Sequence, residues 1–349
     1  MHLSVATVFC FLALVLGVTA QFSYWLDDSC LHYPLPMGQE LSLRPYLEEM
    51  FSMARLAHAR MNKDKASKDL RDVEFRRMYR NIFKTDMDPD SKRKYEYGLE
   101  YKEFWGIDDG SDEARDTAFN IVGETLEKIS NIWTETDQRL DADQRVYCDN
   151  GQHFDEIKDG HYIDTINNVF AGGSCDAEGA DVYAFVTCEK HDENYEQENE
   201  PCLMTICDKA MQSFRYPGMD DWTNVDKPFL LSELLKDDKV TAGFTIDEQA
   251  GFASLLLHEW SHCQPHLTED WFTGDNEDTG ATAEWKCIID IPSTARAVIC
   301  AEAISYIGLA ALLIEGKPNS PDFYSLQWDY ETLPNKQRPV IAKFSAKSD

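Results

Sequence analysis

The stretch GFASLLLHEWSHC, residues 251–263, places two histidines and a glutamate within an apolar run. The apolar residues and the histidines recur at the spacing of an α-helix, on which residues four apart lie one turn above each other. His258 and His262 therefore share one face of the predicted helix. Leu256 and Trp260 fall on the opposite face, where they can pack in a hydrophobic core. The stretch thus predicts a buried helix with one polar face.

The polar face carries residue types that bind and use a metal. Two imidazoles one turn apart can bind one zinc ion, and we expect His258 and His262 to be ligands of Zn²⁺. Glu259 lies beside that face, where its carboxylate can take a proton from a water that zinc has made more acidic. The alternative is a helix with two unrelated histidines, because a pattern with three fixed positions arises by chance in many chains. The apolar lead-in and the acidic loop that follows favour the metal site.

A catalytic zinc ion usually takes a third protein ligand, and the residues alone leave its identity open. The candidates downstream of His262 are carboxylates: Glu269, Asp270, Asp275, Glu277, Asp278, Glu284 and Glu302. Most carboxylates in so acidic a region are simply solvated, so position alone selects none of them. His266 is four residues after His262, but Pro265 is expected to break the helix between them.

The charge balance excludes several classes of protein. The 349 residues include 63 acidic and 33 basic ones, which gives a formal net charge of −30 at pH 7. A nucleic-acid-binding protein needs basic patches that displace phosphate counterions, so we expect no nucleic-acid partner. Anionic membrane surfaces are disfavoured for the same reason. An aromatic content of 12% indicates a substantial core rather than a disordered acidic chain.

The N-terminal residues indicate a compartment. Residues 1–20 contain no Lys, Arg, Asp or Glu, and their apolar run ends in the small residues Thr19 and Ala20. This pattern is typical of a signal peptide cleaved before Gln21. The alternative is a signal anchor, for which the apolar run is short. We therefore expect a secreted protein.

The cysteines point to disulfides rather than to a thiolate site. Of the ten cysteines, Cys10 lies in the expected signal peptide, which leaves nine. In an oxidising compartment most of them are expected to pair, although the sequence does not give the connectivity. Because nine is odd, at least one thiol stays free or joins another chain. No CxxC pair occurs, so zinc or redox chemistry at thiolates is not expected.

The pattern along the rest of the chain predicts an α+β fold dominated by helices. Apolar residues recur at helical spacing over residues 41–61, 75–83 and 116–133. Between residues 141 and 208, five cysteines and short β-prone runs predict short strands and disulfide-tied loops. The apolar stretch 297–314 has the length of the shortest membrane spans but contains Glu302, and we expect a buried core helix.

No internal repeat or linker divides the chain, so we expect one domain over residues 21–316. Residues 317–349 are polar and are expected to form a C-terminal tail.

The stretch Leu255-Leu-Leu-His258-Glu259-Trp260-Ser261-His262 is similar to the zinc helix of secreted fungal metallo-endopeptidases of the deuterolysin and lysine-specific type, the aspzincins. Looser similarities span most of residues 25–314 and lie at Trp25–Cys30, Met204–Cys207, Cys287 and Ala301–Tyr306. The resemblance implies a zincin-like domain that hydrolyses protein or peptide substrates through a zinc-activated water.

The resemblance also narrows the choice of third ligand. Aspzincins take it from an aspartate in a loop shortly after the second histidine. Counting back from Cys287 makes Asp278 the match, with Asp275 and Glu284 behind it.

Two further positions matter for the comparison with the family. The family tyrosine that is thought to help stabilise the oxyanion has no equivalent, because no tyrosine occurs between His262 and Tyr306. Glu302 falls near a family aspartate. It is expected either to hold a zinc-bound imidazole through its N–H or to be an ordinary glutamate of a helix surface.

The sequence therefore predicts a secreted zinc endopeptidase with His258, His262 and Asp278 as ligands and Glu259 as general base. The first alternative is a secreted zinc-binding protein, a scavenger or a surface antigen, with a degenerate site that does not cleave peptides. The second is a structural protein in which the HExxH pattern is coincidental. The cleavage preference and the oligomeric state do not follow from the sequence.

Overall fold

The computed structural model of the chain describes residues 22–35, 38–64, 66–85, 112–131, 133–158, 161–171, 174–175, 182–187, 202–213, 228–240, 242–263, 268, 270, 285, 288, 291, 294–327 and 340–345. The expected signal peptide, residues 1–20, lies outside these ranges, and so do Asp275, Asp278 and Glu284.

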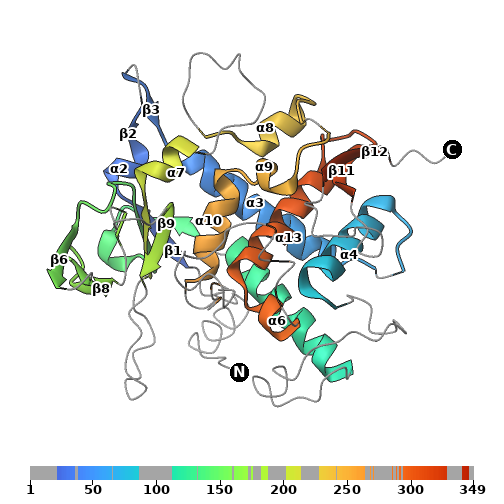
Figure 1. Cartoon of the computed structure of the whole chain (residues 1–349), viewed down its shortest axis with the longest axis horizontal. Helices are drawn as coiled ribbons and strands as arrows, with labels where there is room; N and C mark the ends of the chain where they lie inside the picture. The colour runs from blue at the N-terminus through green and yellow to red at the C-terminus, as the bar shows by residue number, and fades with distance from the viewer. Residues whose placement is uncertain are drawn as a thin grey trace, which may run out of the picture.

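The structure is a mixed α+β fold in which about half of the described residues are helical. Its helices are α2 (Asp28–Leu31), α3 (Arg44–Met61), α4 (Leu70–Phe83), α6 (Asp112–Asn131), α7 (Asp208–Ser213), α8 (Leu231–Lys236), α9 (Ile246–Gln249), α10 (Phe252–Ser261), α12 (Thr294–Val298) and α13 (Ala301–Glu315), with a 3₁₀ turn at η2 (Arg139–Asp141). Figure 1 shows α3, α10 and α13 together at the centre of the molecule. The three helices expected before residue 134 are present as α3, α4 and α6.

A five-stranded sheet packs beside these helices. Its strands, in spatial order, are β4 (Thr134–Glu135), β1 (Ser23–Leu26), β5 (Gln144–Tyr147), β10 (Cys202–Ile206) and β9 (Ala184–Thr187). Four strands are parallel, and β9 is antiparallel to β10 at one edge. Every residue of β5 and β10 is buried, as expected for central parallel strands.

Three smaller sheets lie around this core. They are β2 (Tyr33–Pro34) with β3 (Glu40–Leu41), β6 (Phe154–Lys158) with β7 (His161–Asp164) and β8 (Val169–Ala171), and β11 (Asp322–Gln327) with β12 (Val340–Ser345). In Figure 1 the sheet of β6 and β8 lies on the left, and the β11–β12 hairpin lies on the right near the C-terminus.

Helix α10 is anchored by one aromatic side chain. Trp260 is fully buried and meets Trp133, Phe51 and Tyr24 edge-on, at 4.8, 5.3 and 5.8 Å between ring centroids. Aromatic pairs in this arrangement are worth about 0.5–1.5 kcal/mol each beyond the burial of their area. The apolar face that the sequence predicts for residues 251–263 is therefore confirmed, and it fixes the orientation of the opposite, polar face.

Helix α13 is the buried core helix that the sequence predicts. Every residue from Ala301 to Ile314 is buried. No helix in the described part of the chain is long and apolar enough to cross a membrane. A Cβ on Gly308 would lie 2.4 Å from Leu257 Cδ2 and 3.3 Å from Met53 Cβ. This helix thus approaches α10 and α3 more closely than a larger residue at that position would allow.

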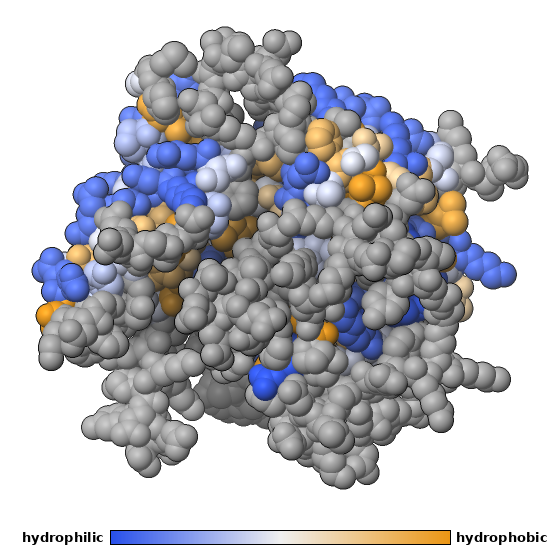
Figure 2. All heavy atoms as spheres, in the orientation of Figure 1, coloured by the Kyte–Doolittle hydropathy of each residue, from blue (hydrophilic) through white to orange (hydrophobic). Residues whose placement is uncertain are grey.

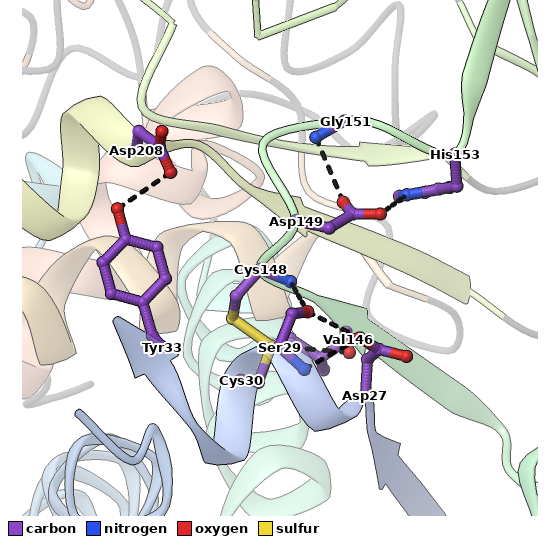
Figure 3. Close-up of a disulfide and its surroundings, with 10 residues drawn as sticks. All are labelled: Asp27, Ser29, Cys30, Tyr33, Val146, Cys148, Asp149, Gly151, His153 and Asp208. Atoms are coloured by element: carbon purple, nitrogen blue, oxygen red, sulfur yellow. Dashed lines mark hydrogen bonds and ion pairs between the residues drawn. A yellow bond between two sulfur atoms is a disulfide. The ribbon is translucent and has the colours of Figure 1, made fainter. Parts of the chain in front are cut away.

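Two disulfides join segments that are distant in the chain. Cys30 is bonded to Cys148 across 118 residues, and Cys175 is bonded to Cys207. Figure 3 shows the first bond, beside which the N–H of Cys148 donates to Ser29 Oγ at 3.0 Å. In the chain-entropy model a crosslink over so long a loop stabilises the folded state by roughly 4–5 kcal/mol.

Three other cysteines are described. Cys202 is disulfide-bonded, and Cys263 and Cys300 are buried thiols. The expectation of a disulfide framework is therefore confirmed. The two buried thiols pack in the interior, and burial raises the pKa of Cys263 well above its ordinary value, which makes that thiol inert.

The C-terminal segment differs from the expectation of a polar tail. Within residues 317–349, the hairpin of β11 and β12 brings Phe323, Leu326 and Ile341 into the core, each at most 1% exposed. The apolar runs are only a few residues long and stand among Lys, Asp, Asn and Pro, so the average polarity of the segment concealed them. The domain therefore continues beyond residue 316.

The described surface is mainly hydrophilic on the face that Figure 2 shows, with small hydrophobic areas between polar ones. The large hydrophobic side chains that are exposed lie on several elements: Leu70, Val73, Leu140, Ile157 and Ile166. Such scattered exposure is ordinary for a globular domain.

The close packing at Gly308 gives the first prediction. Gly308→Ala is expected to lower the free energy of unfolding, because overpacking costs about 1–3 kcal/mol whereas the better helix propensity of alanine returns only about 0.5–1 kcal/mol. Gly123→Ala in α6 is the control: its Cβ would meet only Met61 Cε at 3.7 Å, so it is expected to stabilise the protein. Urea unfolding with intact disulfides measures both, and equal effects of the two substitutions would contradict the packing argument.

Candidate metal centre

Helix α10 (Phe252–Ser261) has Gly251 as its N-cap and His262, in helical conformation, as its C-cap. A capping box precedes it on α9, where Thr245 accepts from the N–H of Glu248 and the Glu248 carboxylate accepts from the N–H of Thr245. The HExxH residues therefore occupy the last turn of a short, well-buried helix. At this end of a helix the backbone carbonyls are free to accept hydrogen bonds from side chains.

Three potential ligand atoms converge at this end. Nε2 of His258 and Nε2 of His262 are 3.2 Å apart. Oδ1 of Asp270 lies 2.9 Å from the first and 3.3 Å from the second. Within the described residues, His258, His262 and Asp270 are the group whose donor atoms lie close enough together to hold one metal ion.

The outer nitrogen of each imidazole faces a different acceptor. Nδ1 of His262 donates to the carbonyl oxygen of Thr268 at 2.9 Å. Nδ1 of His258 lies 2.6 Å from Oε2 of Glu302, which is ion-pair distance. Metal-bound histidines typically have such a carbonyl or carboxylate at the nitrogen that faces away from the metal.

Glu302 reaches His258 because α13 packs along α10 in a fixed register. One turn later on α13 and one turn earlier on α10, Ser305 Oγ donates to the backbone carbonyl of Ser254 at 2.8 Å. Glu302 is 8% exposed. Of the two roles expected for it, a contact with His258 is what the geometry provides.

The donor set fits a zinc ion. A backbone carbonyl can only accept, so His262 carries a proton on Nδ1, and in the neutral imidazole the lone pair is then on Nε2. If His258 likewise directs its Nδ1 proton toward Glu302, three electron-rich atoms meet without a proton between them. That arrangement is repulsive unless a cation or extra protons lie there, and two imidazole nitrogens with one carboxylate oxygen are ligands that zinc prefers.

Charge and burial shift the pKa values in this cluster. Burial acts to lower the pKa of His258, but the carboxylates of Glu302 and Asp270 outweigh it and raise that pKa well above its ordinary value. For Asp270, burial acts to raise the pKa, and the two imidazoles overcome it and hold the pKa far below its usual range. In the metal-free protein the two carboxylates at ion-pair distance therefore favour the charged form of His258.

Glu259 is 6% exposed and lies in the same buried region. Burial raises its pKa, and the neighbouring charges of His258 and His262 partly oppose that effect. A carboxylate with a raised pKa is a better proton acceptor than an ordinary glutamate.

The structure brings together His258, Glu259 and His262, as expected, with Asp270, one of the carboxylates that the sequence left open as the third ligand. The preferred third ligand, Asp278, lies outside the described residues, as do the alternatives Asp275 and Glu284. The signal for Asp270 was its closeness in the chain, since the pair Glu269-Asp270 holds the first carboxylates after His262.

Tyr306 does not supply a free hydroxyl to this group. Its O–H donates to Oδ1 of Asp247, which also accepts from the N–H of Trp285 at 2.7 Å.

Comparisons of the chain with protein-family models, with curated proteins and with solved structures find no match. The function of the site has to be argued from its own chemistry.

The contact between Glu302 and His258 gives a pH-dependent prediction for the metal-free protein. A raised histidine pKa contributes stability that is fully present below about pH 6.5, the unfolded value, and is lost as the pH rises through the folded pKa. Glu302→Gln is therefore expected to destabilise the protein most near pH 6 and progressively less toward pH 9. Urea unfolding in chelator at both pH values tests this, and a loss that is independent of pH would contradict the ion pair.

Proposed function

We propose that this protein is a secreted zinc-dependent endopeptidase in which His258, His262 and Asp270 hold the metal and Glu259 is the general base. The observation that carries the proposal is the convergence of two Nε2 atoms and one carboxylate oxygen within 3.3 Å of one another. Their outer contacts with Glu302 and Thr268 add the support that metal-binding histidines need.

The site is suited to hydrolysis because a base stands beside the ligands. Zinc, when bound, supplies a Lewis acid that polarises a carbonyl group and makes a water more acidic. The carboxylate of Glu259 accepts the proton of the attacking water and later gives it to the leaving amine. The raised pKa that burial gives Glu259 suits both transfers.

Strand β9 supports a peptide as the substrate. In the described part of the chain, β9 is at the edge of the five-stranded sheet and is in contact with α10. An edge strand has backbone N–H and C=O groups that an extended peptide can pair with.

Secretion is supported by the disulfides, which persist in oxidising compartments, and by the apolar run of residues 1–20.

A second candidate function is that of a zinc-binding protein without proteolytic activity. The observation that favours it is the hydrogen bond from Tyr306 to Asp247, which commits the hydroxyl of the first tyrosine after His262 in the sequence. A site without a donor for the developing oxyanion would bind zinc and hydrolyse slowly.

Glu259→Gln separates the two functions. In an endopeptidase this substitution is expected to leave zinc content unchanged and to lower cleavage of a denatured protein such as casein by about 10²–10⁴-fold, because the base is lost and the ligands remain. Glu248→Gln is the matched control, since an exposed capping-box residue tolerates glutamine and full activity is expected. Wild-type protein that binds zinc and cleaves nothing would favour the second candidate.

A pair of substitutions identifies the third ligand. Asp270→Asn is expected to weaken zinc binding by more than the about 10–100-fold typical of a lost outer contact, because it removes a ligand. Asp278→Asn removes the same charge from the same acidic region and is expected to leave the affinity unchanged. Competition with a chromophoric chelator measures both. Loss of zinc binding in Asp278→Asn together with retained binding in Asp270→Asn would instead identify Asp278 as the third ligand.

A further inference from the structure

Thr268, two residues before Asp270, is hydrogen-bonded to the end of α10. The N–H of Thr268 donates to the carbonyl oxygen of Ser261 at 3.2 Å, and its own carbonyl oxygen accepts from His262 at 2.9 Å. Its Oγ1 lies 2.6 Å from Ser261 Oγ. Thr268 is 8% exposed and Ser261 is fully buried, so this contact is largely shielded from water.

The directions of these hydrogen bonds follow from which atoms can donate. Ser261 Oγ lies 2.7 Å from the carbonyl oxygen of His258, which only accepts, so the serine hydroxyl donates there. The serine oxygen then accepts from the hydroxyl of Thr268. The Thr268 carbonyl also only accepts, so His262 donates from Nδ1, and Nε2 is the nitrogen that faces Asp270.

Thr268 therefore bears on two parts of the proposed ligand set. Its carbonyl oxygen fixes the Nδ1 proton of His262, and its hydrogen bonds to α10 lie two residues before Asp270. The side chain of Asp270 is 36% exposed, and its Oδ1 lies within 3.3 Å of both Nε2 atoms. Thr268 stands two residues before it and makes three hydrogen bonds to the last turn of α10.

We propose that Thr268 is a positioning residue which, through its hydroxyl bond to Ser261, holds Asp270 and the Nδ1 proton of His262 in the arrangement that binds the metal. The inference rests on the proposed zinc site and adds to it a residue that does not touch the metal. The hydroxyl pair acts by preorganisation: it removes the cost of ordering the Asp270 segment when the ion binds.

The test is the affinity of the metal-free mature protein for Zn²⁺, measured by competition with a chromophoric chelator. Thr268→Val keeps the size of the side chain and the backbone bonds but removes the hydroxyl, and it is expected to weaken binding by about 10–100-fold. Thr268→Ser keeps the hydroxyl and is expected to bind within about threefold of wild type. If Thr268 only filled space, serine, which lacks the methyl group of threonine, would not restore the zinc affinity.

Ser261→Ala provides the second variant, and a double-mutant cycle with Thr268→Val tests the coupling. If the two hydroxyls act as one unit, the double variant is expected to bind zinc no more weakly than the worse single variant. If the losses in zinc-binding free energy of the two single variants instead add up in the double variant, the two hydroxyls act independently, which would overturn the proposed role of the hydroxyl pair. Wild-type affinity in Thr268→Val, or a loss in Thr268→Ser as large as that in the valine variant, would overturn the role of Thr268.

The outcomes also separate this inference from the proposed function. Tight zinc binding by wild type together with an unaffected Thr268→Val variant would reject the positioning role and leave the endopeptidase proposal standing. Wild-type protein that binds no zinc would reject both. Both comparisons measure zinc affinity and not peptide cleavage, so a low rate of hydrolysis does not affect the result.

Discussion

Helix α10 has to bury an apolar face and a set of ionisable groups at the same time, and the rest of the structure follows from that constraint. A charge taken out of water costs several kcal/mol unless it is paired. His258 lies within ion-pair distance of Glu302 on one side and Asp270 on the other, so its charge is compensated. The opposite face has no such cost, because Trp260 and Leu256 are fully buried among apolar groups.

The partners of the polar face come from distant parts of the chain, and packing determines where they lie. Glu302 arrives on α13, which can approach α10 because residue 308 is glycine. Ser305 on α13 bonds to the carbonyl of Ser254 and fixes the register in which Glu302 meets His258. Asp270 arrives on the segment after α10, which Thr268 attaches to the helix end.

The local features of this arrangement could be predicted from the sequence, and the long-range ones could not. The helical spacing of residues 251–263 predicted the shared face of His258 and His262, and the run 297–314 predicted a buried helix. The contact of Asp270 with the two histidines could not be singled out from the sequence, because many carboxylates follow His262 and spacing does not rank them. The hairpin after residue 316 was missed because its apolar runs are short and the segment is polar on average. In each case the deciding information is a tertiary contact.

The most direct test of the central claim is zinc K-edge X-ray absorption on the mature protein loaded with one equivalent of Zn²⁺. A site of His258, His262 and Asp270 is expected to give a shell of nitrogen and oxygen atoms at about 2.0–2.1 Å, with the multiple scattering of two imidazoles and no sulfur. A shell that contains sulfur at about 2.3 Å, or a spectrum with fewer than two imidazoles, would contradict a site built from His258, His262 and Asp270.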